Sequence, residues 1–180
     1  MTTLVFALLL LAAVLLVYLI MGLRAWMTVR GARIVVCPET QLPVAVKVDV
    51  AHDVVSTILE RPELRLTACS RWPERQDCDQ PCTQQIEIAP SETHPRTIAA
   101  HYFSKERCAI CSRPIEPPSH TAQQPGFMEP VTHWVKTWNE LPAQDLPRAI
   151  ATFQPLCSNC TLVELFRQRS PDRVTDRPAH

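Results

Sequence analysis

The chain has 180 residues, with 18 basic and 18 acidic side chains and a formal net charge of zero at pH 7. A neutral chain offers no strong electrostatic attraction for nucleic acid, so we expect no nucleic-acid partner. The composition includes eight cysteines, 17 prolines and only three glycines. This combination indicates rigid connections and a fold that depends on cysteine chemistry.

The first expected element is an uncharged apolar run over residues 4–23, LVFALLLLAAVLLVYLIMGL. At about 1.5 Å per residue, a helix over this run is roughly 30 Å long, which matches the hydrocarbon core of a bilayer. A cleaved signal peptide is the alternative, but the run is longer than the usual apolar region and no A-x-A motif follows it. We therefore predict a transmembrane anchor over residues 1–24 that contacts lipid through residues 4–23.

Basic residues follow the predicted span. Arg24, Arg30 and Arg33 lie just after it, and no Lys or Arg lies before it. The positive-inside rule then predicts a single-pass protein of the cell inner membrane, with its N-terminus outside and its C-terminal domain in the cytoplasm. Residues 25–33 are expected to form a basic juxtamembrane connector. In a reducing cytosol, paired cysteines favour metal ligation or catalysis, whereas the reverse orientation would favour four disulfides.

After the anchor, the sequence predicts an α+β fold, a small metal-stabilised cytoplasmic domain of short strands and helices. β-Branched and alternating segments predict strands over residues 33–37, 44–50, 63–67 and 131–138. Capping residues and apolar spacing predict helices over residues 53–60, 98–106 and 145–152. Two further helices are predicted, one that begins near residue 81 and one that runs from the last cysteine pair to just before Pro171. The proline-rich segment 112–130 is expected to be irregular, and residues 171–180 to be a disordered tail.

Two C-x-x-C motifs carry the clearest chemistry, CAIC at residues 108–111 and CSNC at residues 157–160. Tetrahedral Zn²⁺ takes four ligands, and a tight turn with two cysteines three apart presents both sulfurs to one ion. The second pair opens a predicted helix, whose N-terminal dipole favours thiolate. The sequence therefore predicts a four-cysteine zinc site within a module over residues 91–170. Its ligands would be Cys108, Cys111, Cys157 and Cys160.

The stretches CAICSRPI and PLCSNCTLVELFRQ together resemble a treble-clef or zinc-ribbon-type zinc finger, such as the one found in HNH nucleases. In the HNH pattern, a histidine follows the cysteine pair at the helix start, but Thr161 stands there in this chain. No Asp-His pair precedes the second motif, where the chain has only Thr132-His133-Trp134. The resemblance, which covers residues 105–168, therefore implies the metal-binding frame without the catalytic histidines.

The four upstream cysteines are less regularly spaced. Cys37, Cys69, Cys78 and Cys82 predict a second four-cysteine site, in a first module over residues 34–90. Four thiolates can hold zinc or an Fe–S cluster, and isolated or alternative pairings also remain open. The segment LRLTACSRWPERQDCDQPC is similar to small membrane-anchored bacterial proteins of unknown function, a resemblance that implies no activity.

Other candidate chemistry is sparse. A thioredoxin-like redox pair is an alternative for C-x-x-C, but it needs a βαβ context. His101 or His133 could replace one cysteine in a site. Trp134 and Trp138 are four residues apart and are expected to fill a small core.

Together these features predict a membrane-anchored protein with two structural zinc ions, and no catalytic residue is nominated. A zinc ion with four protein ligands keeps no open position for water or substrate, so we expect a non-catalytic scaffold or adaptor with a protein partner at the cytoplasmic membrane face. Two alternatives remain, an Fe–S electron-transfer or redox-sensing protein and a degenerate HNH-like nucleic-acid-binding protein.

Overall fold

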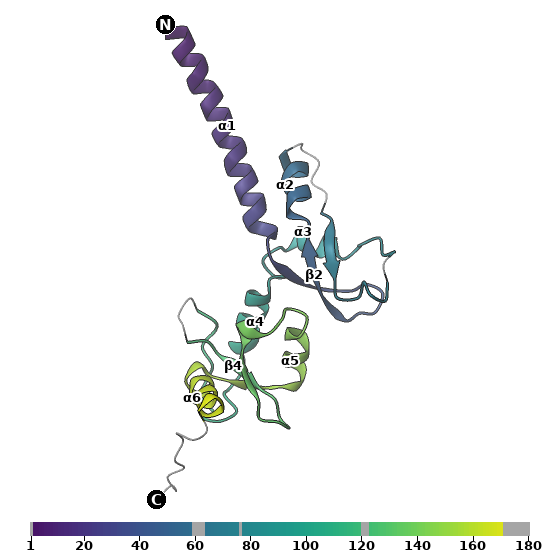
Figure 1. The fold of residues 1–180 in the computed structure, drawn as a ribbon, viewed down its shortest axis with the longest axis vertical. Helices are drawn as coiled ribbons and strands as arrows, with labels where there is room; N and C mark the ends of the chain where they lie inside the picture. Colours follow the sequence, from purple (N-terminus) through teal and green to yellow (C-terminus); the bar gives the residue numbers. More distant parts are fainter. Residues whose placement is uncertain (1, 59–63, 76, 120–122, 171–180) are drawn as a thin grey trace, which may run out of the picture. The chain divides into compact units, whose positions relative to one another are not determined.

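The computed structural model describes residues 2–58, 64–75, 77–119 and 123–170. The chain divides into two compact units, residues 1–93 and residues 94–180. Each unit combines helices with a small sheet, and one apolar helix lies at the N-terminus (Figure 1). The mixed helix and strand class expected from the sequence is thus confirmed.

The N-terminal helix α1 spans Thr2–Val29. Its residues Val5–Arg24 have a mean hydropathy of 2.9, and none of this window is buried. The core helix of a soluble protein would bury an apolar face, and α1 does not. An exposed apolar helix near the N-terminus fits either a membrane span or a signal sequence.

The chain leaves α1 through Gly31, which has a φ of 91° and follows the helix as its C-terminal stop. The next residues enter strand β1, Ala32–Val36, so Arg33 belongs to the sheet. Arg33 is only 2% exposed, and its Nη1 donates a hydrogen bond to the carbonyl of Pro90 at 2.8 Å. Arg33, which was expected to end the basic connector over residues 25–33, is therefore a buried residue of the first sheet.

The first unit contains a three-stranded antiparallel sheet in the order β1-β2-β3, where β2 is Pro43–Val48 and β3 is Leu66–Cys69. Along β2 the side chains of Val44, Val46 and Val48 are buried, as the twofold period of a strand requires. Helix α2 is Val50–Ile58 and helix α3 is Thr83–Ile88. Gln85 of α3 ties the helix to β1, because its amide donates to Val36 O at 2.7 Å and accepts from Val36 N at 2.9 Å.

Three details of the first unit differ from the sequence prediction. Helix α2 begins at Val50 and not at residue 53 as predicted. Asp49 caps it, because its Oδ1 accepts from the first-turn N–H of His52 at 3.1 Å. Asp53 is instead buried inside the helix. Helix α3 begins at Thr83, with Cys82 at its N-cap position, and so starts slightly later than the predicted position near residue 81. The predicted helix end at residue 60 and strand start at residue 63 lie outside the described residues.

The described residues of the second unit form a second antiparallel sheet, in the order β5-β4-β6, and four helices, of which one is a short 3₁₀ turn. The strands are β4 (Gly126–Met128), β5 (Val135–Thr137) and β6 (Gln154–Leu156). The helices are α4 (Pro95–Phe103), η1 (Trp138–Glu140), α5 (Leu146–Thr152) and α6 (Ser158–Arg169). Phe103 of α4 and Phe127 of β4 are fully buried, with ring centroids 5.0 Å apart, and form the centre of the core.

The central strand β4 lies within residues 112–130, which were expected to be irregular. A strand of three residues is too short to show a period in the sequence. The strand predicted over residues 131–138 is reduced to β5, because the chain turns at His133, whose φ is 55°. Trp134 is 56% exposed, so its assignment to the core is wrong. Trp138 is half-buried, and its Nε1 donates to Gln124 Oε1 at 2.9 Å.

Helix α6 does not bury the apolar face expected from its sequence. Leu162, Val163 and Phe166 are all about half exposed, whereas Thr161 is the buried residue. The orientation of the helix is thus determined by contacts other than those of its large apolar side chains. The predicted tail over residues 171–180 lies outside the described residues.

Candidate metal centre

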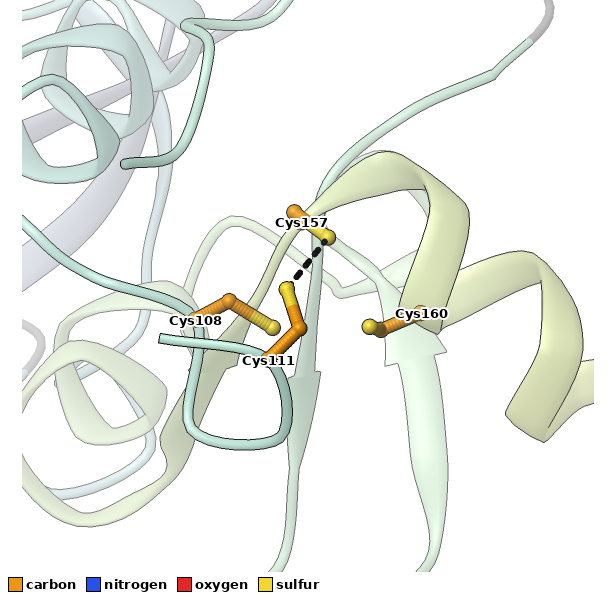
Figure 2. A group of neighbouring side chains, drawn as sticks. All are labelled: Cys108, Cys111, Cys157 and Cys160. Carbon is orange, nitrogen blue, oxygen red and sulfur yellow. Dashed lines mark hydrogen bonds between the residues drawn. The ribbon is translucent and has the colours of Figure 1, made fainter. Parts of the chain in front are cut away.

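The first half of the site is a closed turn that carries Cys108 and Cys111. The N–H of Cys108 donates to Arg113 O at 2.9 Å, and the N–H of Ser112 donates to Cys108 O at 2.8 Å. Ser112 adopts a φ of 58°, which reverses the chain directly after Cys111. This local hydrogen bonding directs both thiols of the C-x-x-C motif to the same side of the turn (Figure 2).

The second half lies where strand β6 passes into helix α6. Cys157 occupies the N-cap position of α6, and Cys160 lies in its first turn. The two halves are joined by a backbone bond, because the N–H of Ala109 donates to Pro155 O in β6 at 2.9 Å. The sheet thus brings together two cysteine pairs that are far apart in the sequence.

All four sulfur atoms of Cys108, Cys111, Cys157 and Cys160 lie within 4.8 Å of one another. Figure 2 shows their side chains pointing toward a common centre, and the Sγ atoms of Cys111 and Cys157 lie 3.7 Å apart. Four sulfurs at about 2.3 Å from a tetrahedral ion would be separated by about 3.8 Å. These cysteines carry no disulfide and are positioned to bind a metal ion.

The surroundings shift the pKa of Cys108 in one direction and those of Cys157 and Cys160 in the other. Burial raises the pKa of Cys108, but hydrogen bonds from backbone N–H groups, those of Cys111 and Cys157 first, outweigh it and lower the pKa to about 6. Burial and the neighbouring thiols raise the pKa of Cys160, and burial raises that of Cys157. A bound divalent cation would favour the thiolate form of the cysteines that hold it.

Helix α6 approaches the sheet closely beside this site. Thr161 is 1% exposed, and its Oγ1 donates to Cys157 O at 3.0 Å. A Cβ on Gly126 of β4 would lie 2.7 Å from Cγ2 of Thr161 and 2.6 Å from the carbonyl oxygen of Lys136. Neither residue was singled out as structural from the sequence, although Gly126 is one of only three glycines. Together they set the position of the helix that carries Cys160.

Replacing Gly126 by alanine is expected to destabilise the second unit by about 1–3 kcal/mol, because the added methyl group overpacks a close contact. The change should lower the thermal melting temperature and increase the rate at which a chelator removes metal. Adding Thr161→Ser should recover only part of the loss, because the Lys136 carbonyl belongs to the backbone and cannot withdraw. A Gly126→Ala protein with wild-type melting and metal release would show that the contact is unimportant.

The upstream cysteines also converge on one place, but less tightly. Cys37, Cys69, Cys78 and Cys82 all line a cavity of about 30 Å³ in the first unit. Cys37 and Cys82 are buried, and the other two are half-buried. Among the described residues, however, only the downstream group brings three or more potential ligand atoms within 4.8 Å of one another. A second metal site is therefore not shown.

A cation that the sequence did not connect with this cavity contacts one of its thiols. Nη1 of Arg71 donates to Sγ of Cys37 at 3.0 Å. The backbone N–H of Thr40, together with Arg71, lowers the pKa of Cys37 to about 7. Burial, and after it the nearby Cys69 and Cys78, raises the pKa of Cys82 to about 11. Arg71 and Cys37 are 34 positions apart, so no local pattern could have paired them.

The histidines considered as substitute ligands are not part of the downstream group, which consists of cysteines alone. His101 lies in the last turn of α4, and His133 forms the turn before β5, where its carbonyl accepts from Gln168. His94 caps α4, because its Nδ1 accepts from the N–H of Arg96 at 3.1 Å.

Comparisons with protein-family models, with curated proteins and with solved structures found no match to this chain.

Proposed function

We propose that this chain is a membrane-anchored zinc protein whose second unit is a non-catalytic scaffold or adaptor for a protein partner at the cytoplasmic membrane face. The observation that carries the proposal is the set of four thiols within 4.8 Å of one another. Four thiolates complete the tetrahedral shell of zinc, so the ion would have no position left for water or substrate. The metal would then stabilise the fold and not perform chemistry.

The order of elements supports a treble-clef-like frame. The turn with Cys108 and Cys111 is followed by the antiparallel pair β4 and β5, and the second cysteine pair opens α6. Thr161 supports the absence of nuclease chemistry. The position at which an HNH-type finger would have its histidine is filled here by a buried side chain that bonds its own helix.

The anchor part of the proposal rests on α1 and its basic flank. Arg24 closes the apolar window, and the guanidinium carbon of Arg30 lies 4.6 Å from the centre of the Trp26 ring. Arg24, Trp26 and Arg30 are all exposed, as expected for side chains at a membrane–water interface. Positive charge on this side of the helix favours a cytoplasmic location for the rest of the chain.

Metal analysis of the full-length chain purified in detergent tests the central claim. We expect zinc that is retained through gel filtration and removed by a strong chelator with loss of ordered structure. Iron with acid-labile sulfide would instead support the electron-transfer alternative. A protein that binds no metal when refolded with Zn²⁺ under reducing conditions would refute the proposal.

Protease accessibility tests the orientation. Trypsin should digest the region after α1 in inverted membrane vesicles and leave it intact in spheroplasts, because only inverted vesicles expose the cytoplasmic face. The opposite pattern would place the cysteines outside the cytoplasm and contradict the adaptor role at the cytoplasmic face. Binding to DNA or RNA at low salt, where phosphate contacts are strongest, would favour the nucleic-acid-binding alternative.

A further inference from the structure

We propose that Cys37, Cys69, Cys78 and Cys82 form a second metal site that takes a single divalent ion, with Arg71 hydrogen-bonded to one of its ligands. This site lies in the first unit and is independent of the downstream cysteines. Its ligands come from four places in the unit: Cys37 directly after β1, Cys69 at the end of β3, Cys78 between β3 and α3, and Cys82 at the start of α3. They nevertheless line one cavity.

The cavity has room for one ion. Its volume of about 30 Å³ is enough to hold one water-sized body, so a single metal ion fits among the four cysteines. The walls include Val44, Leu66 and Trp72, so the surroundings have a low dielectric that strengthens attraction between an ion and thiolates. Four thiols around this cavity are suited to one soft divalent ion.

The charges around the cavity match a thiolate site. Nη1 of Arg71 lies 3.0 Å from Cys37 Sγ and 3.2 Å from Glu39 Oε2, and Arg75 Nη2 lies 3.0 Å from Glu39 Oε1. Four thiolates around a divalent ion carry an excess of two negative charges. The Arg71 hydrogen bond holds a positive charge 3.0 Å from the sulfur of Cys37 and so offsets part of this excess. Such partners orient metal ligands and adjust their affinity.

Binding requires the sulfurs to move closer than they are in the described arrangement. The segment between β3 and α3 carries Cys78. Its described residues, 70–75 and 77–82, contain no helix or strand, so they can adjust without breaking regular structure. Cys37 and Cys82 are already buried in the core cluster with Val46 and Ile86. We expect metal binding to draw Cys69 and Cys78 onto this preformed half of the site.

Metal stoichiometry of the full-length chain in detergent tests the proposal, with Zn²⁺ as the probe. The wild type should bind two ions per chain. Cys78→Ser should retain one, Cys108→Ser should retain one, and the combined variant should retain none. Asp79→Ser, which changes an exposed neighbour of Cys78, is the matched control and should retain two. One ion in the wild type that survives in Cys78→Ser would refute the second site and leave the downstream site intact.

Protection of the cysteine thiols from alkylation by bound Zn²⁺ can be measured in the wild-type protein, so this readout does not require a variant that folds. In the wild-type protein, Zn²⁺ should protect all four upstream cysteines from alkylation, and a chelator should remove the protection. Arg71→Gln should weaken Zn²⁺ binding at this site about 10-fold or more, as loss of a partner to a metal ligand does. Arg75→Gln should weaken Zn²⁺ binding less, because Arg75 contacts Glu39, whereas Arg71 contacts the sulfur of Cys37. Upstream cysteines that alkylate equally with and without Zn²⁺, or that hold iron and sulfide, would overturn the inference.

Discussion

Replacing Cys108 or Cys160 by serine is expected to remove the metal from the second unit and to unfold much of it. Each change deletes one of four sulfurs that lie within 4.8 Å of one another. Structural zinc contributes about 10–16 kcal/mol to the folding of small zinc domains, which is as large as the whole net stability of a typical domain, about 5–15 kcal/mol. The expected result is loss of bound zinc together with loss of cooperative melting of residues 94–170.

The measurement is metal content and thermal melting of the full-length variants in detergent. Ala109→Ser is the matched control, because it places a hydroxyl in the same turn while the backbone bond from residue 109 to Pro155 remains. Ala109 is exposed, so the control should keep both the metal and the melting temperature. If Cys108→Ser and Cys160→Ser each retained wild-type metal content and melting, the four cysteines would not form a structural site.

Introducing Leu11→Arg together with Leu15→Arg is expected to abolish stable insertion of α1 in the membrane. Both leucines are exposed near the centre of the apolar window. An arginine at the centre of a membrane helix costs about 2.5–3.5 kcal/mol, so two should cost about 5–7 kcal/mol. The variant should move from the alkali-resistant membrane fraction to the soluble fraction or to aggregates.

Leu11→Ala with Leu15→Ala is the control, because alanine shortens the side chains without adding charge, and it should remain in the membrane. Mass spectrometry of the purified wild type distinguishes a retained anchor from a signal sequence, since cleavage would remove most of α1. A wild-type chain that is extracted from membranes by alkali would contradict the anchor.

Much of the local structure was accessible from the sequence because it depends on neighbouring residues. The strand pattern of Val44, Val46 and Val48 and the cysteine turn at residues 108–111 follow from spacing alone. The errors occur where tertiary contacts override local preference. Strand β4 is short and forms because β5 and β6 pair with both of its edges. Trp134 lies in a turn whose direction is set by His133, so its ring is left exposed.

In the candidate site, too, the features that depend on local sequence were predicted and those that depend on tertiary contacts were not. The residue type and the C-x-x-C spacing identify Cys108, Cys111, Cys157 and Cys160 as candidate metal ligands, because both motifs are local. The positions of Gly126 and Thr161 beside them could not be foreseen, since their contact joins a strand to a helix that begins about 30 residues later.

The sequence by itself determined that an apolar helix lies near the N-terminus and that two C-x-x-C motifs could bind a metal, since composition and short spacing require no knowledge of the fold. Only the tertiary structure decided which cysteines meet. The bond between Ala109 and Pro155 brings the two downstream pairs within ligand distance. The upstream four share a cavity, with one thiol paired to Arg71. The physical reason is that ligand distance depends on strand pairing and helix packing across many residues, which one-dimensional spacing does not specify.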